Sequence, residues 1–245
     1  MAVVRIFLAG ASGAIGRRLT PLLIDAGHAV TGTTRSAAKA GELTARGVNA
    51  VIVDVFDARA LRDVVVRARP EVVIHQLTDL PPVIDQVRFG AALVANARLR
   101  IEGTAHLVAA SVAAGARRLI AQSIAFAYAE GPEPHREGDP LASAEGDSPG
   151  ATSARGVRVL EEAVLHAPGI AGIVLRYGRL YGPGTWSETA TGRAPLHVDA
   201  AAEAASLAVT RGAPGIYNIA EDDGAVTIDK ARRELGFDPA FRLTG

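Results

Sequence analysis

Three glycines near the start of the chain have the spacing of a phosphate-binding loop. Gly10, Gly13 and Gly16 lie between an apolar run at residues 3–9 and a segment of helical periodicity at residues 14–26. In such a strand–turn–helix unit the first glycine permits a tight turn. The second lets backbone amides approach a pyrophosphate, and the third lets the helix pack closely. The start of the helix adds unpaired N–H groups.

We therefore expect a dinucleotide at this loop; the alternative is a plain tight turn. The residues expected to hold the pyrophosphate are Gly10, Ser12, Gly13, Ala14, Ile15 and Gly16.

The end of the second apolar run indicates which dinucleotide is preferred. NAD-binding proteins usually place an acidic residue there for the ribose hydroxyls. This chain has Thr34 and Arg35 and no carboxylate. An arginine at this position can bind a 2′-phosphate, so we expect NADP(H), with NAD(H) as the alternative. We expect Asp54 to accept from the adenine amino group. The structural alternatives are a solvated arginine and a turn carboxylate.

Short apolar runs alternate with helix-period segments along the chain, as in a parallel sheet covered by helices on both faces. The predicted strands are residues 3–9, 29–34, 48–53, 72–77, 118–123, 170–176 and 215–219. The predicted helices are residues 14–26, 37–46, 58–68, 83–114, 157–166, 198–211 and 229–235, with loops at 130–150 and 177–195. This order predicts an α/β fold with a Rossmann doubly wound parallel sheet, and a single domain over residues 1–245.

The composition narrows the classes of partner. Lysine and arginine number 26, and aspartate and glutamate also number 26, so no broad field favours nucleic acid or an anionic membrane. The chain has no cysteine, which excludes disulfides and thiolate chemistry. The six histidines are scattered without the spacing of metal ligands. No signal peptide or membrane span is predicted, and we expect a cytoplasmic protein without a bound metal.

Several further motifs resemble the NAD-dependent epimerase/dehydratase group of the extended short-chain dehydrogenase/reductase superfamily. They are residues 176–183 (RYGRLYGP), 197–199 (HVD), 215–219 (GIYNI) and 230–239 (KARRELGFDP). The resemblance implies a sheet of about seven strands and a small-molecule substrate beneath a small C-terminal lobe. That lobe, mainly residues 178–200 and 218–245, looks shortened here. The resemblance also implies that Val55, Leu77 and Tyr177 line the cofactor site.

The chain departs from that family at the proton relay. The family uses a Tyr-x-x-x-Lys pair, but the only lysines here are Lys39 and Lys230, and neither follows a tyrosine by four residues. Arg158 falls about where the lysine would lie and is expected to contact the nicotinamide ribose. Ser123 and Tyr128 are the candidate catalytic residues, as an orienting hydroxyl and a replacement acid. Each of the three has a structural alternative in surface, strand-end or loop packing.

These features favour an NADP(H)-dependent atypical reductase or epimerase-like enzyme acting on a small polar carbonyl or sugar-like compound. Two alternatives remain open at this stage: a non-catalytic NADP(H)-sensing protein, and an isomerase, dehydratase or lyase on the same fold. The resemblance also implies a dimer contact through the helices after the fourth and fifth strands. The alanine-rich residues 91–114 would permit close helix approach there, so we expect a homodimer.

Overall fold

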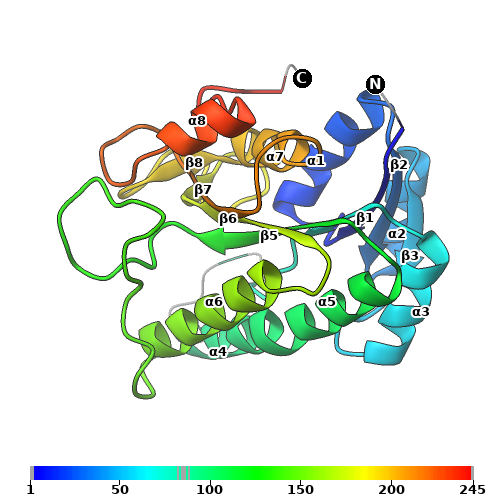
Figure 1. Ribbon diagram of the computed structural model, residues 1–245, viewed down its shortest axis with the longest axis horizontal. Coiled ribbons are helices and arrows are strands. Elements are labelled where there is room, and N and C mark those ends of the chain that lie inside the picture. The colour runs from blue at the N-terminus through cyan, green and yellow to red at the C-terminus, as the bar shows by residue number, and fades with distance from the viewer. Residues whose placement is uncertain (1–2, 82, 84–86, 88, 244–245) are drawn as a thin grey trace.

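The computed structural model describes the chain except residues 1–2, 82, 84–86, 88 and 244–245. Its centre is a parallel sheet of seven strands in the order β3-β2-β1-β4-β5-β6-β9 (Figure 1). The strands are β1 (Arg5–Ala9), β2 (Ala29–Thr34), β3 (Asn49–Ile52), β4 (Val72–His75), β5 (Arg118–Ile124), β6 (Ala171–Tyr177) and β9 (Gly215–Ile219). This is the doubly wound order expected from the sequence.

Helices cover both faces of the sheet (Figure 1). One face carries α1 (Ala14–Asp25), α2 (Ala37–Ala45) and α7 (Val198–Leu207), with α8 (Asp229–Leu235) packed against β9. The other carries α3 (Ala58–Ala68), α5 (Thr104–Ala113) and α6 (Pro149–Leu165). Helix α4 (Phe89–Arg98) packs on α6 and continues through a π-helical turn, η1 (Leu99–Gly103), into α5.

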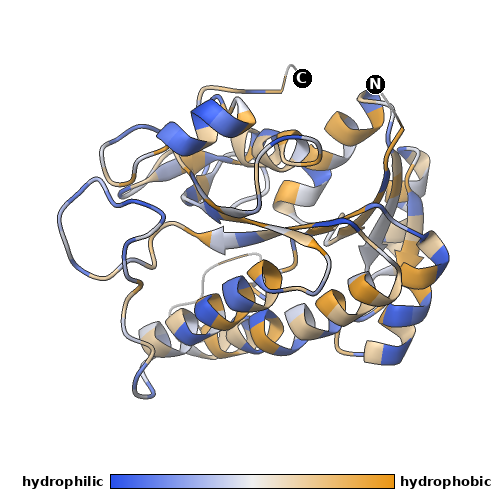
Figure 2. Cartoon of the chain, viewed as in Figure 1, coloured by the Kyte–Doolittle hydropathy of each residue, from blue (hydrophilic) through white to orange (hydrophobic). Residues whose placement is uncertain are grey.

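Alternate side chains of each strand enter the two cores. Along β1, Ile6 and Leu8 join the core beneath α1 and α7, whereas Phe7 joins the core beneath α3 and α5. These strands are therefore apolar on both faces, as Figure 2 shows for the centre of the sheet.

The strand order reverses between β1 and β4, which pair in register with Ala9 opposite His75. The chain leaves β1 toward one face of the sheet and leaves β4 toward the other. Open α/β sheets bind their ligands at this point, just beyond the carboxyl ends of the strands. The glycine loop follows β1 directly and is therefore placed there.

The starts of two helices differ from the sequence prediction. Helix α6 begins at Pro149, not at residue 157, because Ser148 caps it by accepting a hydrogen bond from Ala151 N–H. The predicted helix at 83–114 begins at Phe89 in the described part and contains η1. Residues 82, 84–86 and 88 lie outside the described residues.

The predicted loop at 177–195 contains two short strands. These are β7 (Arg179–Tyr181) and β8 (Pro195–His197), paired in parallel as a separate small sheet. A strand of three residues is too short to show an alternation of polar and apolar residues, so neither strand could be predicted from the sequence. A Cβ at Gly178, just before β7, would overlap the Ala194 carbonyl oxygen, so close approach of the two segments requires this glycine.

Candidate functional site

The three glycines of the loop after β1 differ in whether the surrounding protein requires a glycine at their position. Gly10 has φ +90°, and a Cβ there would lie 2.7 Å from the Gln76 carbonyl oxygen. A Cβ at Gly16 would overlap the Gly10 carbonyl oxygen. Gly13 is different: its φ of −77° suits any residue, and a Cβ there would meet only Gly10 O, at 3.3 Å. The protein itself therefore requires Gly10 and Gly16, whereas Gly13 keeps a space beside the loop open.

That space lies at the start of α1. No side chain caps this helix end, and its first turn contains no acidic residue. The backbone amides of Ala14 and Ile15 thus lack the usual cap acceptor, and the helix dipole favours an anion here. These features fit the pyrophosphate of a dinucleotide.

Hydroxyl groups tie the loop to the end of β2. Ser12 donates to the Thr34 hydroxyl over 3.1 Å, and Gly10 N–H donates to the Thr33 hydroxyl over 3.2 Å. The Thr34 hydroxyl also accepts from Ser36 N–H. Ser12 and Thr34, both predicted cofactor contacts, therefore lie together and position the loop.

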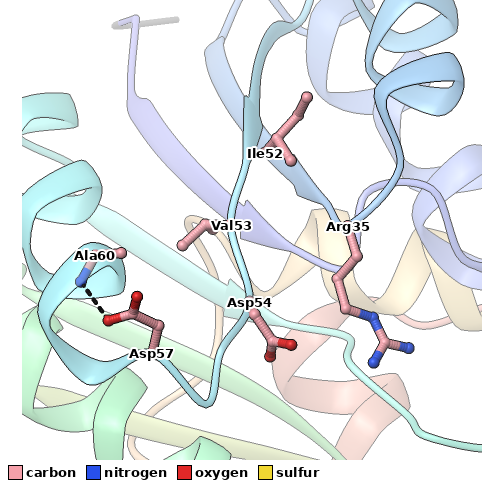
Figure 3. Close-up of a pocket in the computed structure, with 6 residues that line it drawn as sticks. All are labelled: Arg35, Ile52, Val53, Asp54, Asp57 and Ala60. Atoms are coloured by element: carbon pink, nitrogen blue, oxygen red, sulfur yellow. Dashed lines mark hydrogen bonds between the residues drawn. The ribbon is translucent and has the colours of Figure 1, made fainter.

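A pocket of about 360 Å³ opens beside Arg35 (Figure 3). Its lining comes from the ends of β2 and β3 and the start of α3: Arg35, Ile52, Val53, Asp54, Asp57 and Ala60. Asp54 accepts from Phe56 N–H at 3.0 Å, and Asp57 caps α3 by accepting from Ala60 N–H at 2.9 Å. Val55, also predicted to contact the cofactor, is buried against Gly103 and does not line the pocket.

Arg35 has a carboxylate partner that the sequence did not indicate. Its guanidinium lies 3.3 Å from the carboxylate of Asp79, in the segment after β4. Asp79 N–H in turn donates to the Asn96 side chain on α4. The end of β2 has no acidic residue of its own, but the fold brings one to it across the strand-order switch.

Ser123 and Tyr128 both belong to a buried polar layer at the ends of β5 and β6. Glu161 of α6 is at its centre: it accepts from Ser123 Oγ at 2.6 Å and from two nitrogens of Arg176, at 2.7 and 2.9 Å. The Tyr128 hydroxyl accepts from Arg176 at 2.9 Å and donates to Asn218 at 2.7 Å. The structure thus brings both candidate catalytic hydroxyls together and occupies each with a protein partner.

The protonation of this region follows from burial. Burial raises the pKa of the Tyr128 phenol above its ordinary value, against the opposing effect of Arg176. Burial also lowers the pKa of His75 to about 4, and His75 Nε2 lies 3.0 Å from the Thr104 hydroxyl. At neutral pH Tyr128 is therefore a phenol and His75 a neutral imidazole.

Leu77 and Tyr177 lie near the loop after β1. The Leu77 carbonyl accepts from Gln122, and the buried Tyr177 hydroxyl accepts from Gln76 Nε2 at 3.2 Å. The Oε1 of Gln76 is buried and has no partner in the described part of the chain. An orphaned acceptor next to Gly10 fits a donor on a bound ligand. Gln76 was not predicted as a site residue, because a single glutamine after a strand gives no signal.

Arg158 lies on α6, one turn before Glu161, and contacts Leu141, which pairs with Tyr128. It donates to the carbonyl oxygens of Leu141 and Ala142, at 2.7 and 2.9 Å, and so fixes the segment that leads into α6. Its predicted contact with the nicotinamide ribose remains a prediction.

Among the described residues, no cluster of histidine and acidic side chains has the geometry of a metal site. The same residues include no helix that is both long and apolar enough to cross a membrane.

The sequence of this chain matches a family model and a known protein. A family model described as "NAD dependent epimerase/dehydratase family" matches residues 6–211. A Streptomyces protein named "3-diazoavenalumate denitrifying reductase" is 42% identical over 241 residues, which cover 90% of this chain and 77% of that protein.

Solved structures share the fold at lower identity. UDP-glucose 4-epimerase from Thermotoga maritima, with UDP-glucose, gives a TM-score of 0.76 at 18% identity, covering 97% of this chain and 94% of that one. The dTDP-glucose 4,6-dehydratase DesIV from Streptomyces venezuelae, with NAD, gives 0.75 at 19% identity, covering 97% and 92%. UDP-glucose 4-epimerase from Thermus thermophilus, with NAD, gives 0.72 at 24% identity, covering 96% and 84%.

Proposed function

Because the chain belongs to the NAD-dependent epimerase/dehydratase family, we propose that it is an NADP(H)-dependent reductase of a small organic molecule. The observation that carries the proposal is the space beside Gly13, at the uncapped start of α1 and at the strand-order switch. A reductase name on a relative 42% identical supports it. The bound dinucleotide would supply a hydride to the substrate.

The residues that would hold this cofactor come from three strand ends. The amides of Ala14 and Ile15 would bind the pyrophosphate, and Arg35 would bind the 2′-phosphate. Asp54 would accept from the adenine amino group. Asp79 opposes the preference for NADP(H), because its carboxylate pairs with Arg35 and a 2′-phosphate must displace it.

The missing proton relay bears on the substrate class. A carbonyl oxygen that accepts a hydride on its carbon also needs a proton, and helix α6 contains neither tyrosine nor lysine. A diazonium carbon needs none: the hydride forms the C–H bond, and dinitrogen leaves with the electron pair of the C–N bond. The relative's printed substrate is a diazo compound and the anion of an acid. We therefore favour a diazo acid as the substrate class.

Reduction of a small polar carbonyl compound is the second candidate. The Tyr128 hydroxyl favours it, because burial keeps this phenol protonated and able to act as an acid.

A panel assay tests the proposal. Purified protein and NADPH are mixed with aromatic diazonium acids, aldehydes, ketones and nucleotide-sugar ketones, and the absorbance of reduced nicotinamide is followed. We expect NADPH oxidation with the diazonium acids. No oxidation above the protein-free rate with any member of the panel would reject the reductase assignment.

We also propose that the protein works as a homodimer in the cytoplasm. Val94 of α4 and Val112 of α5 are large apolar side chains that remain 55% and 41% exposed in the single chain. Both belong to the alanine-rich residues 91–114, and a second copy would cover them. The absence of cysteine suits a compartment where disulfides do not form.

A further inference from the structure

A buried arginine beside the Glu161 layer lacks a carboxylate partner. Arg100 of η1 is only 9% exposed. Its hydrogen bond in the described part of the chain runs from Nη1 to the Ser153 hydroxyl of α6, over 3.2 Å. No described carboxylate forms an ion pair with it. Placing a charge in such a position is costly unless an anion compensates it.

The nearby charges leave Arg100 uncompensated. Glu161 is the carboxylate within electrostatic range, and Arg176 and Ser123 already occupy it. Burial lowers the pKa of Arg100 to about 10, against the attraction of Glu161, so Arg100 remains charged at neutral pH. His75 is neutral there. Arg100 and Arg176 therefore share the Glu161 carboxylate. The other carboxylate of the layer, Glu137, lies beside Asn218 and accepts from its N–H.

One edge of the Arg100 guanidinium has no protein partner among the described residues and is not fully enclosed. Among described residues, the fully buried side-chain polar atoms without a hydrogen bond are Gln76 Oε1 and Glu203 Oε2. The remaining nitrogens of Arg100 form no hydrogen bond and are not among those atoms, so they keep contact with solvent. Ser153, their neighbour on α6, is half-buried. The unpaired edge of Arg100 beside Ser153 is therefore the part of the guanidinium left for a ligand.

We propose that Arg100 and Ser153 bind the carboxylate of the substrate. A guanidinium edge presents parallel N–H donors that match the two oxygens of a planar carboxylate, and the serine hydroxyl adds a third donor. Helix elements position both residues: the π-helical turn η1 carries Arg100, and the second turn of α6 carries Ser153. Such π-turns frequently mark functional sites. The assignment rests on the proposed function, because it places the acid group of that reductase's substrate.

Binding of a model acid tests the assignment. Calorimetry measures cinnamate and its neutral analogue cinnamamide with wild type, Arg100→Met, Ser153→Ala and Arg62→Met. Arg62 is an exposed arginine on α3 and serves as the matched control. We expect Arg100→Met to weaken cinnamate binding at least about tenfold and Ser153→Ala to weaken it less. Arg62→Met should change nothing, and cinnamamide should not distinguish wild type from Arg100→Met.

A stability measurement separates binding from a purely structural role. Without added carboxylate, Arg100→Met should have a Tm equal to or above that of wild type, since it removes an uncompensated charge. Cinnamate should raise the Tm of wild type and not of Arg100→Met. Inorganic phosphate, at matched ionic strength, should act equally on both proteins.

Three results would overturn the assignment. They are no cinnamate binding by wild type, equal cinnamate binding by wild type and Arg100→Met, and a phosphate effect on wild type that exceeds that of cinnamate. NADPH binding is titrated in the same samples by fluorescence. Failure of NADPH to bind would reject the proposed function, whereas failure of cinnamate alone would reject only the carboxylate site.

Discussion

The residues of the proposed cofactor site are of two kinds: those whose identity the fold requires, and those whose identity only a bound ligand would explain. Gly13 is of the second kind, because its φ of −77° suits any residue and a Cβ there would meet only the Gly10 carbonyl oxygen, at a tight 3.3 Å that a small shift relieves. Gly13→Val should abolish NADPH binding while the protein stays folded, since the new side chain would occupy the pyrophosphate position. Calorimetry checks this. Gly41→Val is the control, because Gly41 on α2 faces open space; unchanged NADPH affinity in Gly13→Val would contradict the placement.

Cofactor preference depends on the competition between Asp79 and a 2′-phosphate for Arg35. A charge-assisted arginine–phosphate contact predicts a preference for NADPH over NADH of about 10- to 150-fold. Arg35→Ala should remove most of it with little change for NADH. Asp79→Asn should raise the NADPH affinity by about twofold to fivefold, because this ion pair is exposed and weak. Fluorescence titration measures each Kd, and equal affinities of wild type for both dinucleotides would demote Arg35 to a surface residue.

Tyr128 distinguishes the two substrate classes. With a carbonyl acceptor, Tyr128→Phe should lower kcat about 100-fold, because the phenol would supply the proton. With a diazonium acceptor, kcat should change by less than about threefold. NADPH affinity should stay unchanged with both. A large loss with the diazonium acceptor would show that the phenol acts on that substrate as well.

The sequence predicted the cofactor residues unequally. The glycine spacing is local, so the turn and the helix start could be derived from it directly. Asp79 lies 44 residues after Arg35, and only the pairing of β1 between β2 and β4 brings the two together. Arg100 and Glu161 also escaped prediction. Each is one charge on a helix, and their burial depends on the strand ends they cover.

Among the elements, an ion pair joins α1 and α7, two of the helices on one face of the sheet. Arg18 of α1 donates from two nitrogens to Asp199 of α7, whose side chain is 3% exposed. Burial disfavours the charged form of Asp199. The hydrogen bonds from Arg18 and from Leu243 N–H outweigh this effect, and the pKa of Asp199 lies below its ordinary value.

Asp199→Asn should therefore lower the free energy of unfolding at neutral pH by about 2–4 kcal/mol. The loss should lie at the lower end of this range if water hydrates the partly exposed Arg18 guanidinium in the variant. Because the folded pKa is depressed, this contribution is complete above the unfolded pKa and is lost as pH falls through the folded pKa. Urea unfolding at neutral and acid pH measures both effects. The control is Asp222→Asn, in an exposed ion pair, which should lower the free energy of unfolding by less than about 1 kcal/mol. If Asp199→Asn were destabilised as much at acid pH as at neutral pH, the ion pair with Arg18 would not be the cause.

Elements with strong periodicity were predicted closely. Strands β2 and β9 and helices α3 and α8 match their predicted ranges exactly in the structure. The start of α6 was missed because the segment at 130–150, rich in proline and glycine, predicted a loop up to Gly150. A Cβ at Gly156 would lie 3.0 Å from Ala97 of α4, so this glycine permits close packing of two helices. The contact between α4 and α6 therefore explains why residue 156 is a glycine, whereas helix propensity alone would disfavour it.

In the whole molecule, the seven-stranded sheet and its helices form a doubly wound fold, and the proposed dimer would extend the face of α4 and α5. Sedimentation at micromolar concentration should give twice the chain mass of 25.3 kDa. Replacing Val94 and Val112 together by arginine should shift the protein toward monomer, since a buried interface does not accept unpaired charges. A wild-type protein that sediments as a monomer would reject the dimer.

The central claim is hydride transfer from a dinucleotide bound at the glycine loop. Its most direct test uses NADPH deuterated at the transferred position and an aromatic diazonium acid, with mass spectrometry of the product. We expect one deuterium at the carbon that lost dinitrogen and one NADP⁺ formed per product molecule. Gly13→Val should transfer no deuterium to the product. A product without deuterium, or equal labelling with and without the protein, would contradict the central claim.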